Sequence, residues 1–361
     1  MSTITELWVT RSELRRTKVV KTERATLGDG EIRVSVDTMG LTANNVSYAV
    51  SGEMIGYWKY FPAEGEWGKV PGWAMGDVVE SRSSAIATGE RLYGFFPMAS
   101  EVVLRPGNVS DDFFMDESSH RAGLPALYNQ YRRTQGEPDY LTSLETERCL
   151  LFPLFVTSFV LYDYLIDNDF FGAQQILIGS VSSKTGFGLA HLLKNHPALG
   201  RKIVGLTSTR NAAFVESLKS CDQLVTYGGE NAIDTGLRTA WIDMSGDGPL
   251  TDKLHHLLGD NMVESCIVGA THWEAERKRG GDLPGAKPTF FFAPGHIAKR
   301  DAEWGQGEIW RRGAEAGVDI AQTVSGLLDV EQISGVDQVA EIWCDMLDNK
   351  VAPHRGIMIA L

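Results

Sequence analysis

The stretch that decides the fold is ILIGSVSSKTGFGLA, residues 176–190. Its apolar first part has the pattern of a buried strand, and a turn of small residues follows it. Gly186 and Gly188 then stand at the start of a helical pattern. Small residues at this point allow the backbone to approach a diphosphate, whose charge is stabilised by the helix N-terminus. The stretch therefore predicts a dinucleotide-binding turn.

The chain after residue 150 continues this pattern. Apolar runs alternate with helical patterns, such as those of residues 187–194 and 211–220. Such alternation predicts a doubly wound α/β unit, a parallel sheet with helices on both faces. The predicted strands are 175–178, 202–207, 223–226, 241–244, 265–268 and 289–292.

The chain before residue 150 has a different pattern. Residues 32–37 alternate between apolar and polar side chains, which predicts a strand with one buried face. Short apolar runs at 77–79 and 101–104 are separated by Gly, Pro and Ser, as is typical of a small β-barrel or sandwich. The final run, 356–361, predicts a closing strand that rejoins this first domain.

The length of the chain, 361 residues, predicts two domains at about 150 residues per domain. We assign residues 1–150 and 304–361 to the β-rich domain, and residues 151–303 to the nucleotide-binding domain.

The turn itself carries polar groups suited to phosphate. The hydroxyls of Ser182, Ser183 and Thr185 are candidate donors, and Lys184 is a candidate cation. An ordinary tight turn between a strand and a helix is the alternative interpretation, because the glycine pattern is degenerate. A Walker A loop needs Gly directly before the Lys, where this chain has Ser183. We therefore expect a dinucleotide rather than a nucleoside triphosphate.

The end of the second predicted strand indicates which dinucleotide is bound. Residues 205–210 include hydroxyl side chains and Arg210, but no Asp or Glu to bind the ribose 2′-hydroxyl of NAD. A guanidinium pairs with a 2′-phosphate through charge-assisted hydrogen bonds, so this segment favours NADP(H) over NAD(H). Alternatively, Arg210 is a solvated charge at the start of a helix. The predicted cofactor-binding residues are Ser182, Ser183, Lys184, Thr185, Gly186, Phe187, Ser208, Arg210, Tyr227 and Gly269.

Charge and composition exclude other classes of partner. The chain has 34 Lys and Arg against 47 Asp and Glu, a net charge of -13, which repels a nucleic-acid backbone. The longest uncharged apolar stretch, 149–162, is too short to span a bilayer, and no targeting segment is evident. The four cysteines form no CxxC pair. We expect a cytoplasmic protein without metal, nucleic-acid or membrane partners.

The order of motifs along the chain resembles the medium-chain dehydrogenase/reductase superfamily, in its zinc-independent quinone oxidoreductase and enoyl reductase branch. This resemblance implies a GroES-like β-barrel catalytic domain, a Rossmann nucleotide-binding domain and a homodimer. More narrowly, the turn at 182–188 and the segment Tyr128–Tyr131 resemble the DUF2855 proteins. The other motifs that carry the resemblance are 31–45, 71–79, 89–96 and 157–165.

Departures from the superfamily pattern concern the zinc ligands and the turn. Zinc-dependent members carry a Cys shortly after the position of Gly40 and a Gly-His-Glu triplet where this chain has Gly72-Trp73-Ala74. Both ligand sets are missing, so the resemblance implies zinc-independent chemistry. Two glycines of the usual Gly-x-x-Gly-Gly-x-Gly turn are also replaced. The segment 118–147 is longer than is usual for the superfamily, and either an active-site cover or an extended dimer contact would account for it.

The resemblance also indicates where a proton donor would lie. Related enoyl reductases use a Tyr from the loop after the first barrel strands, and Tyr48 and Tyr57 lie in the matching region, with Asn44 as a polar orienting residue. The alternative is that these aromatic rings only pack the domain. We predict an NADPH-dependent oxidoreductase that transfers hydride to an activated C=C bond, a quinone or a carbonyl compound, with an apolar or aromatic substrate. A catalytically silent NADPH-binding protein and a non-redox, lyase-type enzyme are the alternatives.

Overall fold

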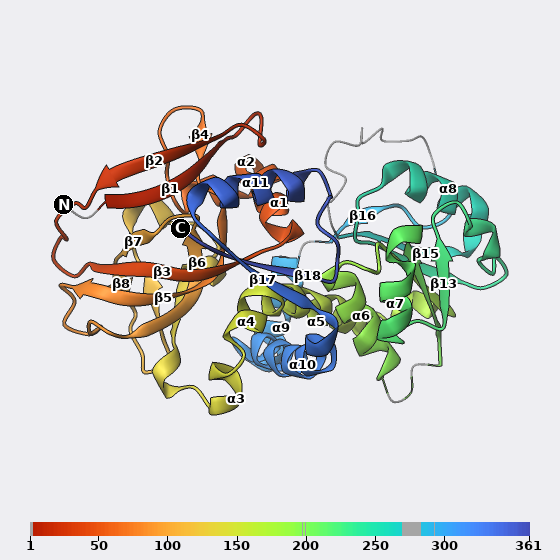
Figure 1. The fold of residues 1–361 in the computed structure, drawn as a ribbon. Coiled ribbons are helices and arrows are strands. Elements are labelled where there is room, and N and C mark those ends of the chain that lie inside the picture. The colour runs from red at the N-terminus through yellow and green to blue at the C-terminus, as the bar shows by residue number, and fades with distance from the viewer. Residues whose placement is uncertain (1–2, 197, 199, 269–282, 292) are drawn as a thin grey trace. The chain divides into compact units, whose positions relative to one another are not determined.

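The computed structural model describes residues 3–196, 198, 200–268, 283–291 and 293–361. Its chain divides into two compact units (Figure 1). Unit 1 comprises Met1–Leu150 and Leu328–Leu361, and unit 2 comprises Leu151–Leu327. The first boundary lies where the sequence placed it. The return to unit 1 comes at Leu328, whereas the sequence analysis placed it at 304.

Unit 1 is built on two sheets of mainly antiparallel strands. A three-stranded sheet has the order β2-β1-β4, and a nine-stranded sheet has the order β17-β18-β3-β5-β6-β10-β9-β8, with β7 also paired to β3. The strands are β1 Thr3–Thr10, β2 Thr17–Glu23, β3 Ile32–Leu41, β4 Trp67–Gly68, β5 Pro71–Ser81, β6 Arg91–Pro97, β7 Glu101–Leu104, β8 Pro106–Gly107, β9 Phe113–Asp116, β10 Gln130–Arg133, β17 Asp329–Ser334 and β18 Arg355–Ala360.

The helices of unit 1 are mostly short and connect these strands. They are α1 Ala43–Val50, α2 Gly52–Ile55, η1 Tyr57–Lys59, η2 Ser119–Arg121, η3 Ala126–Asn129, η4 Thr134–Gly136, α3 Asp139–Thr142, α4 Glu145–Leu150 and α11 Val336–Leu347.

The C-terminal strand closes unit 1, as the sequence predicted. β18 pairs with β3 through Ile357 opposite Leu41 and Ile359 opposite Met39. Figure 1 shows blue β18 running beside the red strand β3. Gly40 is required at this place, because a Cβ there would overlap the backbone of Cys149. The first and last parts of the chain therefore belong to the same compact unit.

Unit 2 has a six-stranded parallel sheet of order β13-β12-β11-β14-β15-β16. This is the 3-2-1-4-5-6 order of a Rossmann fold, and it confirms the predicted doubly wound sheet. The strands are β11 Gln175–Gly179, β12 Lys202–Thr207, β13 Gln223–Thr226, β14 Thr239–Asp243, β15 Met262–Ile267 and β16 Thr289–Phe290. The helices are α5 Phe152–Asp167, η5 Asp169–Gly172, α6 Lys184–Lys194, η6 Thr209–Asn211, α7 Ala212–Leu218, η7 Glu230–Ala232, α8 Gly248–Leu258, η8 Gly259–Asn261, α9 Ala293–Trp304, α10 Glu308–Val324 and η9 Ser325–Leu327.

Alternate side chains of β11 explain why helices cover both faces of this sheet. Ile176 and Ile178 pack in one core with Leu161 of α5 and Leu189 of α6. The intervening Leu177 packs in a second core, whose other members include Leu250, Leu254 and Leu258 of α8. Both sides of each central strand are therefore apolar, as a parallel sheet between two helical layers requires.

Helix α10 explains the later return of the chain to unit 1. Its buried residues, which include Ile309, Gly313, Gly317 and Ile320, recur at helical spacing and form one apolar face. This face packs on α5: a Cβ on Gly313 would lie 3.5 Å from Val156. The predicted boundary missed this packing, because the polar outer face of α10 dominates its composition.

A buried ion-pair cluster holds α9 against α5. The Nε atom of Arg300 lies 2.6 Å from Oδ2 of Asp163, and Nε2 of His296 lies 2.5 Å from the same oxygen. Burial alone would raise the pKa of Asp163, but the hydrogen bonds and charges of His296 and Arg300 outweigh it and lower that pKa. The carboxylate is therefore held in its charged form.

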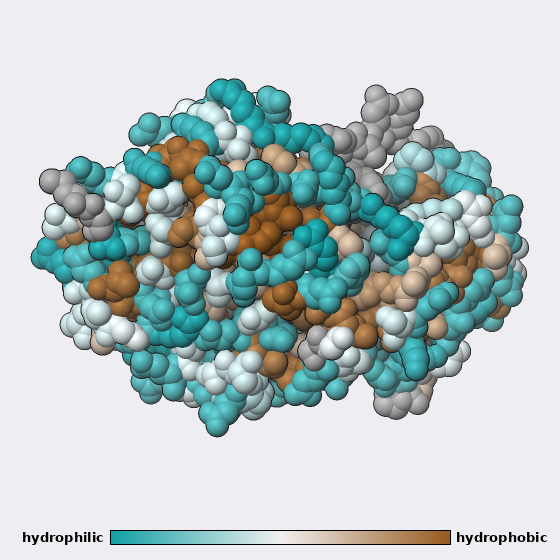
Figure 2. Space-filling view, viewed as in Figure 1, coloured by the Kyte–Doolittle hydropathy of each residue, from teal (hydrophilic) through white to brown (hydrophobic). Residues whose placement is uncertain are grey.

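The surface in Figure 2 is mainly hydrophilic, with separate brown areas over both units. Large apolar side chains that are exposed come from different elements, as Val19, Met54, Phe290 and Val330 show. Among the described residues, no helix combines the length and the apolar character needed to cross a membrane. All four cysteines are free thiols.

Candidate functional site

The predicted dinucleotide turn joins β11 to α6. Gly179 ends β11 against the neighbouring strand, where any Cβ would overlap the ring of Trp241. A Cβ on Gly186 would lie 2.7 Å from the carbonyl oxygen of Ser180. Ser180 has a φ of 49°, in the left-handed region. Small residues are therefore required here, because the turn packs closely against its own backbone and against Trp241.

Two of the predicted hydroxyl donors bind groups of the protein itself. Ser183 is the N-cap of α6, and its Oγ accepts a hydrogen bond from the backbone N–H of Gly186 at 3.1 Å. Ser182 is buried, and its Oγ accepts hydrogen bonds from Thr207 Oγ1 at 3.1 Å and Asn211 Nδ2 at 3.2 Å. Ser182 therefore fastens the turn to the end of β12.

Phe187 and Thr185, two further residues of the turn, differ in position. Phe187, which the sequence analysis placed among the cofactor-binding residues, is fully buried and packs against Phe155 and Phe214. Its ring belongs to the core, because it lies on the inner face of α6. Thr185 is half-buried, and its carbonyl oxygen accepts a hydrogen bond from Ser158 Oγ at 2.8 Å.

Lys184 is the first residue of α6 and is half-buried. Burial lowers the pKa of its ammonium group to about 8. The positive end of the helix also disfavours a cation at this position. An anion bound at the turn would stabilise the charged form, so this position suits a phosphate ligand.

The end of β12 carries an unsatisfied hydroxyl. The Oγ atom of Ser208 is buried, and the described residues provide no hydrogen-bond partner for it. Arg210, two residues further on, is exposed at the start of the next helical turn. A polar atom buried without a partner is costly, and a bound ligand that reaches it removes this cost.

The ends of two further strands meet the turn. The Tyr227 hydroxyl, just after β13, accepts a hydrogen bond from the backbone N–H of Ser180 at 3.0 Å, and burial raises its pKa to about 12. Asp243 ends β14 in register with Gly179. It is buried, and it accepts hydrogen bonds from the backbone N–H groups of Ser245 at 2.8 Å and Gly246 at 3.0 Å. The sequence analysis did not single out Asp243, although an Asp before Ser-Gly at a strand end is a recognisable signal. Gly269 lies outside the described residues.

The groups at the ends of β11 and β12 are of the kinds that a bound dinucleotide would contact. Gly186 lets the turn fold tightly on the Ser180 carbonyl at the start of α6. The Ser208 hydroxyl, for which the described residues provide no hydrogen-bond partner, stands at the strand end where the adenosine ribose would be read. Arg210 stands beyond it, and no carboxylate replaces it there.

A second group of candidate residues lies in unit 1. We call Tyr48, Tyr57, Tyr60, Trp73, Phe95 and Tyr128 the aromatic cluster, because their rings contact one another with centroids 4.7 to 6.3 Å apart. Tyr48 lies on α1, whose N-cap Thr42 forms a capping box with Asn45. Asn44 is one turn before Tyr48 on the same helix face, and its Nδ2 donates to the Tyr48 hydroxyl at 2.7 Å.

The Tyr48 hydroxyl receives a second donor. The indole N–H of Trp73, on β5, donates to the same oxygen at 3.0 Å. Burial raises the pKa of Tyr48, while the donors from Trp73 and Asn44 act in the opposite direction because they stabilise a phenolate. Among the described residues, no acceptor binds the hydroxyl proton of Tyr48. The sequence analysis predicted Asn44 and Tyr48 but missed Trp73.

Tyr57 has a different environment. Its hydroxyl is hydrogen-bonded to that of Tyr128 at 2.8 Å, and burial raises its pKa. Tyr128 comes from the segment 118–147, so one role of that segment is to complete the aromatic cluster. Arg121 anchors it: this arginine is buried beside Asp116, with 2.9 Å between Nε and Oδ2, and its guanidinium lies 4.6 Å from the ring centroid of Phe61.

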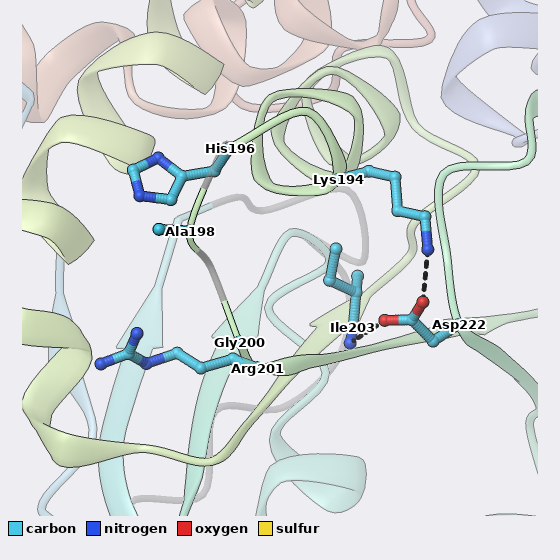
Figure 3. A pocket seen from close by; sticks show the side chains of 7 residues that line it. All are labelled: Lys194, His196, Ala198, Gly200, Arg201, Ile203 and Asp222. Atoms are coloured by element: carbon cyan, nitrogen blue, oxygen red, sulfur yellow. Dashed lines mark hydrogen bonds and ion pairs between the residues drawn. The ribbon is translucent and has the colours of Figure 1, made fainter.

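A pocket of about 310 Å³ opens elsewhere in unit 2 (Figure 3). It is lined by residues that include Lys194, Arg201 and Asp222, and it lies where α6 ends and β12 begins. The Lys194 ammonium is paired with Asp222, as the dashed line shows. Ligands of parallel α/β sheets bind at the opposite, carboxyl ends of the strands, so this pocket is not part of the predicted site. Within the described residues, no three His, Cys, Asp or Glu side chains gather as a metal site.

Comparisons with known proteins agree with this arrangement. A family model described as "Protein of unknown function (DUF2855)" matches residues 39–352. None of the curated proteins matches the sequence. Among solved structures, the chain is similar to a quinone oxidoreductase from Coxiella burnetii, at 15% identity, a TM-score of 0.53 and full coverage of both chains.

Two further structures give the same result. CurA from Vibrio vulnificus, in complex with NADPH, is 11% identical with a TM-score of 0.58. The yhdH oxidoreductase from Salmonella enterica, in complex with NADP, is 14% identical with a TM-score of 0.52. Each comparison covers 99% of both chains. The predicted combination of a GroES-like barrel and a Rossmann unit is thereby confirmed as the fold.

Proposed function

The chain belongs to the DUF2855 family of proteins of unknown function, and we propose that it is a zinc-independent, NADPH-dependent oxidoreductase. The observation that carries the proposal is the set of strand ends around the turn after β11. There Gly186 lies in the first turn of α6, and the Ser208 hydroxyl has no hydrogen-bond partner among the described residues. Arg210 follows, and residues 205–210 include no carboxylate to select NAD. NADPH or NADP is bound in two structures of the same fold.

The residues of the turn would hold the cofactor. The backbone near Gly186 and the N-terminus of α6 would bind the diphosphate, with Lys184 as a local cation. Ser208 and Arg210 would bind the ribose and its 2′-phosphate. When bound, NADPH supplies a hydride.

In unit 1, Tyr48 would serve as the proton donor. Reduction of an enone, quinone or carbonyl compound places negative charge on the substrate oxygen, and a hydrogen-bond donor must stabilise it. The O–H bond of Tyr48 breaks, and its proton passes to that oxygen. The phenolate left behind is stabilised by the N–H groups of Asn44 and Trp73 until solvent returns a proton.

The character of the aromatic cluster supports an apolar or aromatic substrate. Trp73 and Tyr128 are half-buried, so apolar ring surface remains accessible beside the Tyr48 hydroxyl. Aromatic faces of this kind bind planar, conjugated molecules well.

The direct test is NADPH oxidation with a panel of enones, quinones, aldehydes and ketones, together with product analysis. We expect at least one class to be reduced with one NADPH consumed for each product. Tight NADPH binding without consumption across the whole panel would contradict the oxidoreductase proposal and favour a silent NADPH-binding protein. Product formation without net NADPH oxidation would instead indicate non-redox chemistry.

Replacement of Arg210 tests the cofactor preference. We expect Arg210→Ala to weaken NADPH binding about 10- to 100-fold, because a charge-assisted pair with the 2′-phosphate contributes about 1.5–3 kcal/mol. NADH lacks this phosphate, so its affinity should change less than twofold. Titration calorimetry with both nucleotides measures the two effects. Arg201→Ala, which removes an arginine from the pocket of Figure 3, is the matched control. Equal losses for NADPH and NADH would refute the role of Arg210.

A further inference from the structure

Trp73 lies on β5 and is one of the two side chains that donate a hydrogen bond to the Tyr48 hydroxyl. Here the ring nitrogen of Trp73 carries a hydrogen and donates it to Tyr48 at 3.0 Å. An indole N–H has no lone pair to offer a metal, so it acts only as a donor.

The Trp73 ring is held firmly in this orientation. It stacks on Tyr93 with centroids 5.5 Å apart and an interplanar angle of 26°. Tyr93 is buried, and its hydroxyl donates to the carbonyl oxygen of Arg148 at 3.0 Å. Phe95 also contacts the Trp73 ring, with centroids again 5.5 Å apart. The indole N–H is therefore presented to Tyr48 by rings that are themselves fixed.

Two N–H groups on one phenolic oxygen determine where its proton can lie. Asn44 Nδ2 and Trp73 Nε1 both donate to the Tyr48 oxygen, so the sides of the oxygen that face them are taken by hydrogens. The hydroxyl proton must avoid both and lie in the remaining direction, in which the described residues place no acceptor. The chain thus keeps a buried phenol with its proton available for an external acceptor.

We infer that Trp73 is a positioning residue for Tyr48: together with Asn44, its indole N–H directs the Tyr48 proton toward the substrate oxygen and stabilises the phenolate that remains. The inference rests on the proposed function for the identity of the substrate oxygen. The positioning of the Tyr48 hydroxyl itself is argued only from its hydrogen bonds to Trp73 and Asn44.

The first arm of the test needs no substrate. A fluorinated tyrosine is incorporated at position 48, and its ionisation is followed by ¹⁹F NMR as the pH is raised. Trp73→Phe keeps a stacked aromatic ring but removes the N–H, so we expect the phenol to ionise at higher pH than with Trp73 present. A benzothienylalanine at position 73, in which sulfur replaces the N–H, should give the same shift with less change in shape. An unchanged phenol pKa in both variants would overturn the inference.

The second arm uses turnover. Trp73→Phe should lower kcat about tenfold with NADPH affinity nearly unchanged. In a Tyr48→Phe background, the same replacement should cause no further loss, because its target is gone. Equal losses in both backgrounds would show a merely structural role and would contradict the inference.

The two arms separate the inference from the proposed function. A wild-type protein that turns over no acceptor would refute the oxidoreductase proposal. The fluorotyrosine titration needs no substrate, so it would still show whether the Trp73 N–H lowers the pKa of the phenol at position 48.

Discussion

Tyr48→Phe is expected to lower kcat on the order of 100-fold while the Kd for NADPH stays within twofold of the wild-type value. The replacement removes the hydroxyl that would donate a proton to the substrate oxygen, and positioned acids and single oxyanion donors contribute about 10²–10³ in rate. The residues proposed to bind the cofactor lie in unit 2, so we expect no change in NADPH affinity. Steady-state kinetics with the accepted substrate and calorimetry with NADPH measure the two quantities.

The aromatic cluster provides a matched control for Tyr48. Tyr60 is buried in the same cluster, but its hydroxyl donates to the carbonyl oxygen of Pro125 at 3.0 Å and so has a structural partner. Tyr60→Phe should therefore cost about 1 kcal/mol of stability and leave kcat within a few-fold. Tyr57→Phe breaks the bond to Tyr128 and tests the other predicted donor. A normal rate in Tyr48→Phe with a large loss in Tyr57→Phe would transfer the role to Tyr57.

The largest effect on stability is expected at Arg121. Arg121→Met should lower the free energy of unfolding of unit 1 by about 3–5 kcal/mol, because it leaves the Asp116 carboxylate buried without its cation. The arginine is 2% exposed, and its Nη2 also donates to the Tyr131 hydroxyl at 3.2 Å. Urea denaturation followed by tryptophan fluorescence measures the change.

Two further variants show whether the buried charge is the cause. Asp116→Asn combined with Arg121→Met removes both charges and retains a side-chain oxygen for the backbone N–H of Ser118. This double variant should recover part of the loss. Arg132→Met removes an arginine that is 43% exposed and paired with Glu137, and it should cost less than about 1 kcal/mol. Equal losses in the Arg121 and Arg132 variants would contradict the explanation.

The strands of unit 2 could be predicted from the sequence because each one is a short apolar run. The predicted ranges 202–207 and 223–226 coincide with β12 and β13. The run in β12 reflects burial of nearly the whole strand, a local property of a central parallel strand, whereas β13 lies at the edge of the sheet and is only partly buried. The end of the sixth predicted strand, residue 292, lies outside the described residues. That α10 belongs to unit 2 and not to unit 1 could not be predicted, because this depends on its packing against α5, more than 140 residues earlier in the chain.

The two candidate groups of residues, one in each unit, differ in how far the sequence reveals them. Asn44 and Tyr48 are four residues apart, so once α1 is recognised they must share a helix face. Trp73 and Tyr128 reach Tyr48 and Tyr57 only through the pairing of β5 and the fold of the segment 118–147. No local pattern encodes such contacts. The same holds for Ser208: that the described residues offer its hydroxyl no partner follows from how those residues are placed in space.

The central claim is that unit 2 binds NADPH, and thermal unfolding with NADPH and NADH side by side tests it most directly. A ligand that binds only the folded protein stabilises it by RT ln(1 + [L]/Kd), about 2.7 kcal/mol at a concentration of 100 Kd. Arg210 and Ser208 predict a clear rise in Tm with NADPH and a much smaller rise with NADH at the same concentration. No shift with either nucleotide, or equal shifts with both, would contradict the account.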